Sequence, residues 1–395
     1  MNTLADAPMP AVTRFPRPIA AAAADHTSGN PGGRTRWRAR IVARALLARG
    51  PRHEPRGEPQ RILIAHHLLL GDTLMLTPLL KKLRTLHPQA DIVMTVPRAT
   101  APIYATRPYG VRALPFDPRR DPSALFSEGP FDLAFVPGDN RYSWLAAAMR
   151  ARWIVAFGGD RPASKSWQVD RQIPYPAAPA AWGDMVARLA DGPAPPPYDS
   201  SEWPAPPAAP FGLPPAPCAV LHVGASSPLK CWEAARWMDL ADRLAARGIA
   251  PVWSAGPGEA KLVDAIDGSA RHRSYAGSLD LPQLWRLLGH ARLLVAPDTG
   301  VAHLGRIVGV PTVALFGPGS AVICGAGDFW RDAPYRAVTV DPLPCRDQRM
   351  LFKREIPWVR RCGRSVAQCP RHLCMPMIGV ADVLRAIDSL EASFA

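Results

Sequence analysis

The segment LLVAPDTGVAHL, Leu293 to Leu304, constrains the fold most strongly, because it predicts a buried parallel strand that turns directly into a helix. The apolar run ends at Pro-Asp-Thr-Gly, and the expected helix covers Val301 to Val308. Such a unit directs free backbone N–H groups and a positive dipole end at one point, which suits a phosphate. Asp298 and Thr299 occupy capping positions, and His303 lies in the first turn. Simple capping and a structural histidine therefore remain alternatives to a binding site.

Strand–helix alternation recurs on both sides of a proline-rich segment, residues 191–217, which has eleven prolines in twenty-seven positions. This pattern predicts two parallel α/β lobes joined by a stiff linker, in keeping with a length of 395 residues. Ligands bind beyond the carboxyl ends of strands in such sheets, and Gly71-Asp72 lies at one of these ends. The expected strands include 61–67, 91–96 and 218–223, and the expected helices include 73–87, 232–247 and 378–390. We expect the helix at 378–390 to pack across both lobes.

The first 57 residues are rich in Pro, Ala, Arg and Gly, and we expect a mostly disordered, basic tail. Within it, Arg34 to Arg49 has the spacing of a short amphipathic helix. One face would carry Trp37, Ile41, Ala45 and Leu46, with six arginines around it. This composition is typical of a helix on an acidic membrane surface, although a solvated helix is an alternative.

The net charge of +14 lies mainly in two stretches, residues 1–60 and 345–374, each with a surplus of six positive charges. Localised basic surface indicates anionic partners. The sequence has no basic motif interleaved with aromatic residues, so we do not expect nucleic acid among them. No apolar run is long enough to span a bilayer. The run from Ile19 to Ala24 is too short for the apolar core of a signal peptide. Together these two observations predict a cytoplasmic protein.

Four of the seven cysteines lie close together near the end of the chain: Cys345, Cys362, Cys369 and Cys374. Thiolates at this density are candidate ligands for zinc or iron. Their spacing lacks the paired C-x₂-C pattern of zinc ribbons, so buried or free thiols are an alternative.

Three ordered stretches of the chain resemble glycosyltransferase family 9, the heptosyltransferases of lipopolysaccharide assembly. The first begins with RILI at Arg61, includes Gly71-Asp72 and continues through TPLLKKLR and HPQA to Ala90. The second is LHVGAS from Leu221 with KCW at Lys230 to Trp232. The third runs from YAGSL at Tyr275 through ARLLVAPDTGVAH to GVPTVALFGP, which ends at Pro318. CPRHLCM, Cys369 to Met375, is similar to the C-terminal signature of the family.

This resemblance implies an α/β GT-B fold, with two Rossmann-like lobes and the active cleft between them. Residues 58–190 would form the acceptor lobe, and residues 218–395 the donor-nucleotide lobe with a cysteine-containing end. The implied reaction is inverting, metal-independent transfer of heptose from ADP-heptose to a sugar hydroxyl of the lipopolysaccharide core. The implied setting is the cytoplasm, with peripheral attachment to the acidic inner-membrane surface.

The resemblance also implies site residues at matching positions. Asp72 matches the general base, which an inverting displacement requires to take the acceptor proton. Lys230 matches a lysine that neutralises the leaving diphosphate. The remaining positions would bind the donor: Ser226, Ser227, Asp298, Thr299, Gly300, His303 and Gly317.

Two other hypotheses fit the same sequence. The catalytic machinery would be shared by a GT-B transferase that uses another nucleotide sugar, or a protein acceptor of the autotransporter type. A non-catalytic GT-B-like binding protein is a separate class. The presence of both Asp72 and Lys230 favours an enzyme over a binding protein.

Overall fold

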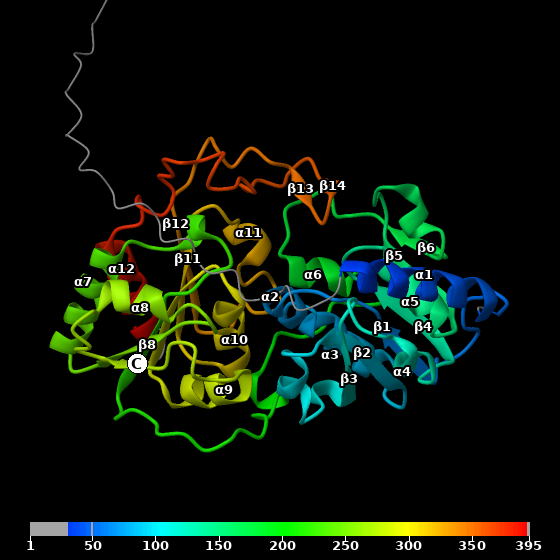
Figure 1. Ribbon diagram of the computed structural model, residues 1–395, viewed down its shortest axis with the longest axis horizontal. Coiled ribbons are helices and arrows are strands. Elements are labelled where there is room, and N and C mark those ends of the chain that lie inside the picture. Colours follow the sequence, from blue (N-terminus) through cyan, green and yellow to red (C-terminus); the bar gives the residue numbers. More distant parts are fainter. Residues whose placement is uncertain (1–30, 49, 393–395) are drawn as a thin grey trace, which may run out of the picture.

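Two six-stranded parallel sheets form the centres of two lobes, which lie side by side in Figure 1. The computed structural model describes residues 31–48 and 50–392, and of residues 31–34 only the backbone. The N-terminal lobe is on the right of the view and the C-terminal lobe on the left. Helices cover both sheets, so the central strands are buried on both faces and consist mainly of apolar residues.

The sheet of the N-terminal lobe has the order β3-β2-β1-β4-β5-β6. Its strands are β1 (Arg61–Ile64), β2 (Asp91–Pro97), β3 (Val111–Phe116), β4 (Phe131–Val136), β5 (Ala151–Phe157) and β6 (Arg171–Ile173). Its helices are α2 (Leu70–Leu74), α3 (Thr77–Leu86), α4 (Ser123–Phe126), α5 (Tyr142–Ala148) and α6 (Trp182–Ala187).

The sheet of the C-terminal lobe repeats that order as β9-β8-β7-β10-β11-β12. Its strands are β7 (Cys218–His222), β8 (Ala250–Ser254), β9 (Arg273–Ser274), β10 (Leu293–Pro297), β11 (Thr312–Phe316) and β12 (Tyr335–Thr339). Its helices are α7 (Ala234–Ala246), α8 (Ala260–Ile266), α9 (Leu281–His290), α10 (Gly300–Val308), α11 (Ala321–Cys324) and α12 (Val380–Glu391). The last helix packs on α7 and β12 of its own lobe, so the expectation that it crosses the lobes is wrong.

The direction of winding reverses between β1 and β4 in one sheet and between β7 and β10 in the other. Ligands of open α/β sheets bind at these switch points. The turn after β1 leads to α2, and the turn after β10 leads to α10, and these two helices pack against each other. The two switch points therefore face one another across the junction of the lobes.

The helix expected over residues 73–87 is two helices, α2 and α3. Pro78 lies in the first turn of α3, where a proline needs no backbone N–H. In the interior of one continuous helix the same proline would remove a hydrogen bond and clash with the preceding turn. The chain therefore ends α2 at Leu74 and begins a new helix at Thr77.

The basic segment before β1 contains α1 (Pro31–Ala48), which packs along α5. Ile41 and Ala45 are buried against the N-terminal lobe, whereas Leu46 and Leu47 are exposed. The helix predicted from Arg34 to Arg49 within the basic tail is thus present as α1. Residues 1–30 of the expected tail lie outside the described residues. Among the residues placed in the structure, no helix is both long and apolar enough to cross a membrane.

The proline-rich linker is docked between the lobes. Trp203 is 2% exposed, and its ring lies 4.9 Å from that of Tyr104 in the N-terminal lobe and 5.8 Å from that of Trp285 in α9. The hydroxyl of Tyr198 donates a hydrogen bond to the carbonyl of Ile307 at 2.7 Å. These contacts join the linker to both lobes along one edge of their junction.

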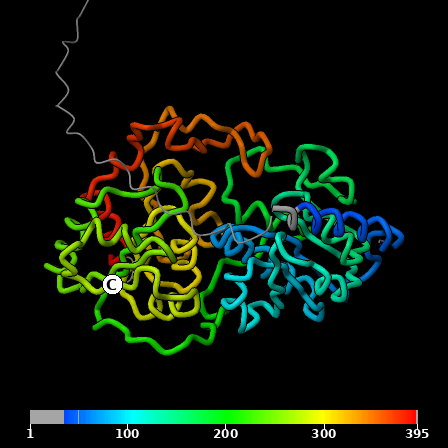
Figure 2. The backbone as a smooth tube through the Cα atoms, in the orientation of Figure 1, coloured from blue at the N-terminus to red at the C-terminus, as the bar shows by residue number. Residues whose placement is uncertain are grey.

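A second crossing lies at the opposite edge. Residues 340–378, which we call the strap, leave the C-terminal lobe after β12, reach the N-terminal lobe and return to α12 (Figure 2). At its far end the strap forms a hairpin of β13 (Met350–Leu351) and β14 (Arg354–Glu355). In Figure 1 the strap runs along the top of the molecule and the linker along the bottom.

Candidate active site

A cavity of about 450 Å³ lies between the two switch points. The N-terminal lobe contributes Leu69, Gly71, Asp72 and Trp182 to its lining. The C-terminal lobe contributes three turns, at 226–230, 298–303 and 318–324, and the strap contributes residues 351–352 and 361–364. Every predicted catalytic or donor-binding residue except Gly317 lines this one cavity.

Two glycines allow α2 and α10 to approach closely. A Cβ on Gly71 would lie 2.8 Å from Cδ2 of His303, and a Cβ on Gly300 would lie 2.9 Å from Cβ of Leu70. Real Cβ atoms do not show contacts this short, so a side chain at either position would displace the neighbouring side chain or its helix. This contact places the first turn of α2, with Asp72, directly against the first turn of α10.

Asp72 is the third residue of α2, and its partly buried carboxylate makes no hydrogen bond within the described residues. The helix begins after Leu69 without any side-chain cap, so the capping alternative for Asp72 is wrong. Burial raises the pKa of Asp72 from 3.8 to about 6; Asp298 also raises it, whereas Lys230 and Arg361 lower it. A carboxylate with this pKa is ionised at neutral pH and accepts protons readily.

Lys230 is held by Asp298. Its ammonium group donates to the Asp298 carbonyl at 2.7 Å and to Oδ2 of the same residue at 2.8 Å. This ion pair connects the turn after β7 with the turn after β10. The charge of Lys230 is therefore already paired, which the sequence did not indicate.

The N-terminus of α10 is open towards the cavity. Thr299 is its N-cap, but its side chain makes no capping hydrogen bond, and its buried hydroxyl has no partner in the described part of the chain. Backbone N–H groups of a first helical turn are also unpaired within their own helix. An unpartnered hydroxyl beside such a turn fits a phosphate group.

His303 is positioned by Arg306, one turn further along α10. Arg306 donates from Nη2 to Nδ1 of His303, so the imidazole carries its proton on Nε2, which faces Gly71. Burial lowers the pKa of His303, and the charges of Arg306 and Lys230 lower it further, so the ring is neutral. Arg306 is itself fixed between the rings of Trp330 and Tyr335, each 4.7 Å away.

The other predicted donor-site residues differ in their surroundings. Ser226 is exposed at the cavity, whereas the hydroxyl of Ser227 accepts a hydrogen bond from the N–H of Leu229 at 3.3 Å. Gly317 does not line the cavity, because Met375 of the strap packs against it. The glycine loop after β11 instead faces the cavity through residues 318–320.

The four C-terminal cysteines do not form a metal site among the residues that the structure places. No group of three or more His, Cys, Asp or Glu side chains with suitable geometry is present there. Arg364 donates to Sγ of Cys362 at 3.6 Å and to the carbonyl of Cys345 at 2.6 Å. A guanidinium beside these thiols is unfavourable for a cation, so the residues do not fit the metal hypothesis.

Sequence reasoning missed Arg306, Trp182 and the cavity residues of the strap, except Cys362, which it named only as a candidate metal ligand. Arg306 follows His303 by three residues on a helix, a spacing that places two side chains on one face. The strap residues gave a weaker signal, the basic run WVRRCGR at 358–364. Only the path of the strap across the lobes brings that run to the cavity.

The whole arrangement can be compared with known proteins. Residues 136–328 match the profile of glycosyltransferase family 9 (heptosyltransferase). Residues 136–328, just under half of the chain, belong to glycosyltransferase family 9. The matched residues run from the end of β4 to just beyond α11 and include Lys230 and the Asp298 turn, whereas α2 with Asp72 lies before them.

The chain is also similar to curated proteins that are named as heptosyltransferases. Lipopolysaccharide heptosyltransferase 3 of Escherichia coli is 28% identical over 184 residues, 44% of this chain and 47% of that protein. The match thus spans about half the length of that curated relative.

Solved structures show the same fold. The glycosyl transferase family 9 protein of Veillonella parvula DSM 2008 superposes with a TM-score of 0.66 at 18% identity, covering 86% of this chain and 99% of that one. The E. coli heptosyltransferase WaaC, solved with ADP-2-deoxy-2-fluoro heptose, gives 0.58 at 17% identity, covering 83% and 99%. The predicted GT-B fold of two Rossmann-like lobes is confirmed.

Proposed function

We propose that this family 9 protein transfers heptose, with inversion, from ADP-heptose to a sugar hydroxyl of the lipopolysaccharide core. The observation that carries the proposal is the position of Asp72: an unpaired carboxylate of one lobe faces the open end of α10 in the other. The names of the relatives, lipopolysaccharide heptosyltransferases, support the donor and the acceptor class.

In the proposed reaction, residues 58–190 bind the acceptor and residues 218–395 the donor. Asp72 takes the proton of the acceptor hydroxyl while that oxygen attacks the anomeric carbon. The bond from the anomeric carbon to the phosphate oxygen breaks on the opposite face, which inverts the configuration.

The diphosphate leaves with added negative charge. The first turn of α10, the hydroxyl of Thr299 and the Nε2–H of His303 would stabilise that charge, and what supports this role is that Thr299, Gly300 and His303 line the cavity. Lys230 contributes positive charge beside them while it holds the Asp298 turn. We propose that these groups suffice without a metal ion. Ser226 would contact the donor from the exposed side of the cavity.

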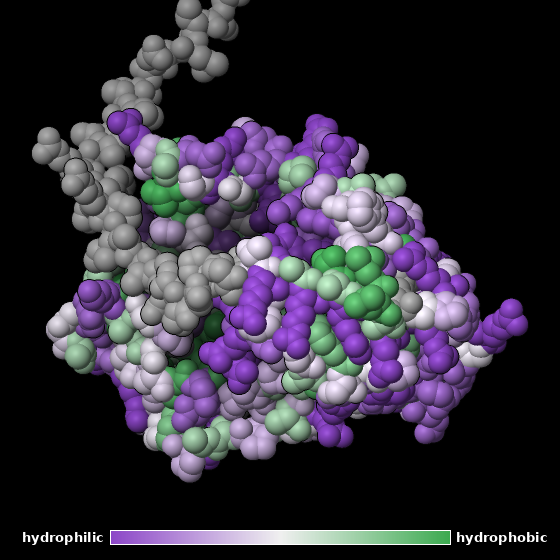
Figure 3. Space-filling view, turned by 45° about the vertical axis from the view of Figure 1, so that its right-hand side comes forward, coloured by the Kyte–Doolittle hydropathy of each residue, from purple (hydrophilic) through white to green (hydrophobic). Residues whose placement is uncertain are grey.

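We further propose that the protein acts at the acidic surface of the inner membrane, on its cytoplasmic side. An apolar patch surrounded by hydrophilic residues is visible on the face that carries α1 (Figure 3). Leu46 and Leu47 are exposed there, and Arg36, Arg40 and Arg44 lie on the same helix. Exposed leucines next to arginines suit a surface of anionic lipid headgroups. The same positive charge would attract an acidic glycolipid acceptor.

The proposal is tested by calorimetry of the purified protein with ADP, ADP-heptose and a panel of UDP- and GDP-sugars. We expect selective binding of the two adenine ligands. Asp72→Asn should keep that binding and reduce turnover on a core glycolipid by about 10²- to 10⁴-fold, the range for loss of a general base. Preference for another nucleotide, or transfer only to a protein, would contradict the heptose or the acceptor assignment. An absence of nucleotide binding would exclude the transferase.

A further inference from the structure

Among the described residues that line the cavity, one cation has no hydrogen-bond or ion-pair partner. Lys230 is paired with Asp298 at 2.8 Å, and Arg364 forms two hydrogen bonds with Asp347, at 2.9 and 2.7 Å. The half-buried guanidinium of Arg361 lines the same cavity but makes no hydrogen bond or ion pair with any residue placed in the structure. A partly desolvated charge without a counter-charge is costly, so an anionic ligand is the expected complement.

The charge of Arg361 acts on the reacting side of the cavity. It lowers the pKa of Asp72, on the N-terminal lobe, and that of Cys324, at the end of α11. Arg361 therefore lies within electrostatic reach of both lobes, at the junction where donor and acceptor would meet.

The backbone at Arg361 is fixed to the C-terminal lobe. Its N–H and carbonyl pair with Gln348 at 3.2 and 3.1 Å. The next N–H, that of Cys362, donates to the Pro318 carbonyl at 2.9 Å. Pro318 belongs to the glycine loop after β11, so Arg361 keeps its position relative to the lobe that would hold the nucleotide.

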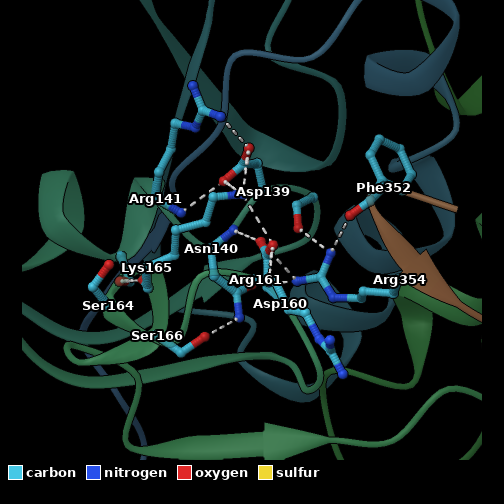
Figure 4. A network of polar contacts seen from close by, with 12 residues as sticks. Asp139, Asn140, Arg141, Asp160, Arg161, Ser164, Lys165, Ser166, Phe352 and Arg354 are labelled. Carbon is cyan, nitrogen blue, oxygen red and sulfur yellow. Dashed lines mark hydrogen bonds and ion pairs between the residues drawn. The ribbon is translucent and has the colours of Figure 1, made fainter.

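The far end of the strap is anchored in the other lobe by Arg354, which is 3% exposed (Figure 4). Its guanidinium donates to Oδ1 of Asn140 at 2.7 Å and to the carbonyls of Gly138 and Gly158 at 3.0 and 2.9 Å. It also forms an ion pair with Asp160 at 3.4 Å. The segment that carries Arg361 is thus held at one end by each lobe.

We infer that Arg361 is a ligand-binding residue that contacts the phosphoryl oxygens of a nucleoside diphosphate in the cavity. Arg354 is a positioning residue that holds the strap in place for this contact. The inference rests on the proposed function and adds to it a binding residue from outside both sheets. A guanidinium suits this task because its planar N–H groups match two phosphoryl oxygens at once. The hydrogen bond from Cys362 to Pro318 ties the segment around Arg361 to the donor lobe. The expected ligand of Arg361 is therefore the diphosphate of the donor and not an acidic group on the acceptor.

The test is calorimetry of ADP and adenosine with the wild-type protein, Arg361→Gln and the matched control Arg360→Gln. Arg360 is the exposed neighbour, and its guanidinium donates to the carbonyls of Pro357 and Val359 outside the cavity. We expect R361Q to weaken ADP binding by about 10- to 100-fold, the range for a hydrogen bond to a charged group. Adenosine, which has no phosphate, should bind equally to all three proteins, and R360Q should bind ADP like the wild type.

Two results would overturn the inference, and they are distinguishable. If the wild type and R361Q bind ADP equally well, Arg361 is not a phosphate contact, but the proposed function stands. If the wild type binds neither ADP nor inorganic pyrophosphate, the inference and the proposed function both fail.

The positioning role of Arg354 needs a separate readout. Arg354→Lys keeps the buried charge but loses the planar fork, so it should weaken ADP binding without unfolding the protein. In the double variant with R361Q, ADP binding should be no weaker than with R361Q alone, because both changes remove the same contact. Additive losses would show that Arg354 affects ADP binding independently of Arg361, and unchanged ADP binding in R354K would show that Arg354 does not position the contact; either result overturns the positioning role.

Discussion

The imidazole of His303, in the C-terminal lobe, lies against the Cα of Gly71 in the N-terminal lobe so closely that a Cβ at position 71 would meet Cδ2 at 2.8 Å. Asp72 follows directly in the chain. The position of the proposed base therefore depends on a histidine of the opposite lobe, and that histidine depends in turn on Arg306. This chain of contacts leads to the first prediction.

Gly71→Ala should reduce kcat/KM by at least 10-fold. The added methyl group must displace His303 or α2, and an error of about 1 Å in the position of a catalytic group costs about 10²-fold in rate. Initial rates with the donor and a core glycolipid measure the effect, and circular dichroism checks the fold. Gly57→Ala is the control, since a Cβ at position 57 meets nothing within 4 Å. Full activity of G71A would show that the close approach is not needed.

The pH dependence of kcat/KM should have an acid limb near pH 6, because Asp72 must be ionised and its pKa is raised to about 6. Below that pH the rate should fall about tenfold per unit. Arg361→Gln removes a charge that lowers this pKa, so the limb should move to higher pH. Asp298→Asn removes a charge that raises it, so the limb should move to lower pH. If the acid limb stays at the same pH in both variants, it reports the ionisation of a group other than Asp72.

Asp72→Asn should stabilise the fold at pH 7.5. The carboxyl has a higher pKa in the folded state than its ordinary 3.8, so ionisation at neutral pH favours the unfolded state. The rise to about 6 corresponds to at most about 3 kcal/mol in the free energy of unfolding. The gain should shrink as the pH falls towards 4, where the carboxyl is protonated in both states. Urea unfolding at pH 7.5 and 4.5 measures it, with exposed Asp332→Asn as control. A loss of stability at pH 7.5 would mean that the Asp72 carboxylate contributes favourable contacts.

Helix α1 offers a pair of residues with opposite exposure. Ile41 is 9% exposed and Leu47 is 87% exposed. Ile41→Asp should lower the free energy of unfolding by about 3 kcal/mol or more, because it buries an unpaired charge, whereas Leu47→Asp should change it by less than about 0.5 kcal/mol.

The same two variants separate folding from membrane binding. Leu47→Asp should reduce sedimentation with vesicles that contain anionic lipid, and all proteins should bind purely zwitterionic vesicles poorly. If Leu47→Asp sediments like the wild type, α1 is not the membrane-binding element.

The sequence predicted the sheets and the centre of the site because both depend on local patterns. Apolar runs located the strands, and the turns after them placed Asp72 and the Asp298 turn at carboxyl ends, where parallel topology brings them together. Arg306 could have been found from its spacing to His303. The role of the strap could not, because Arg354 lies 214 residues from Asn140 and only the folded chain joins them. For the same reason the burial of Ile41 on α5 had no signal beyond an amphipathic pattern.

The linker and the strap cross between the lobes at opposite edges of their junction. A protein with one crossing can separate its lobes by rotation about that crossing alone. Here a wide separation of the lobes also requires the guanidinium of Arg354 to leave its buried partners, which costs free energy because a buried charge then loses its contacts. We therefore expect small ligands to enter and leave the cavity while both crossings stay in place. Turnover would then be limited by the exchange of the larger substrate, and weakening the strap would speed product release at the expense of affinity.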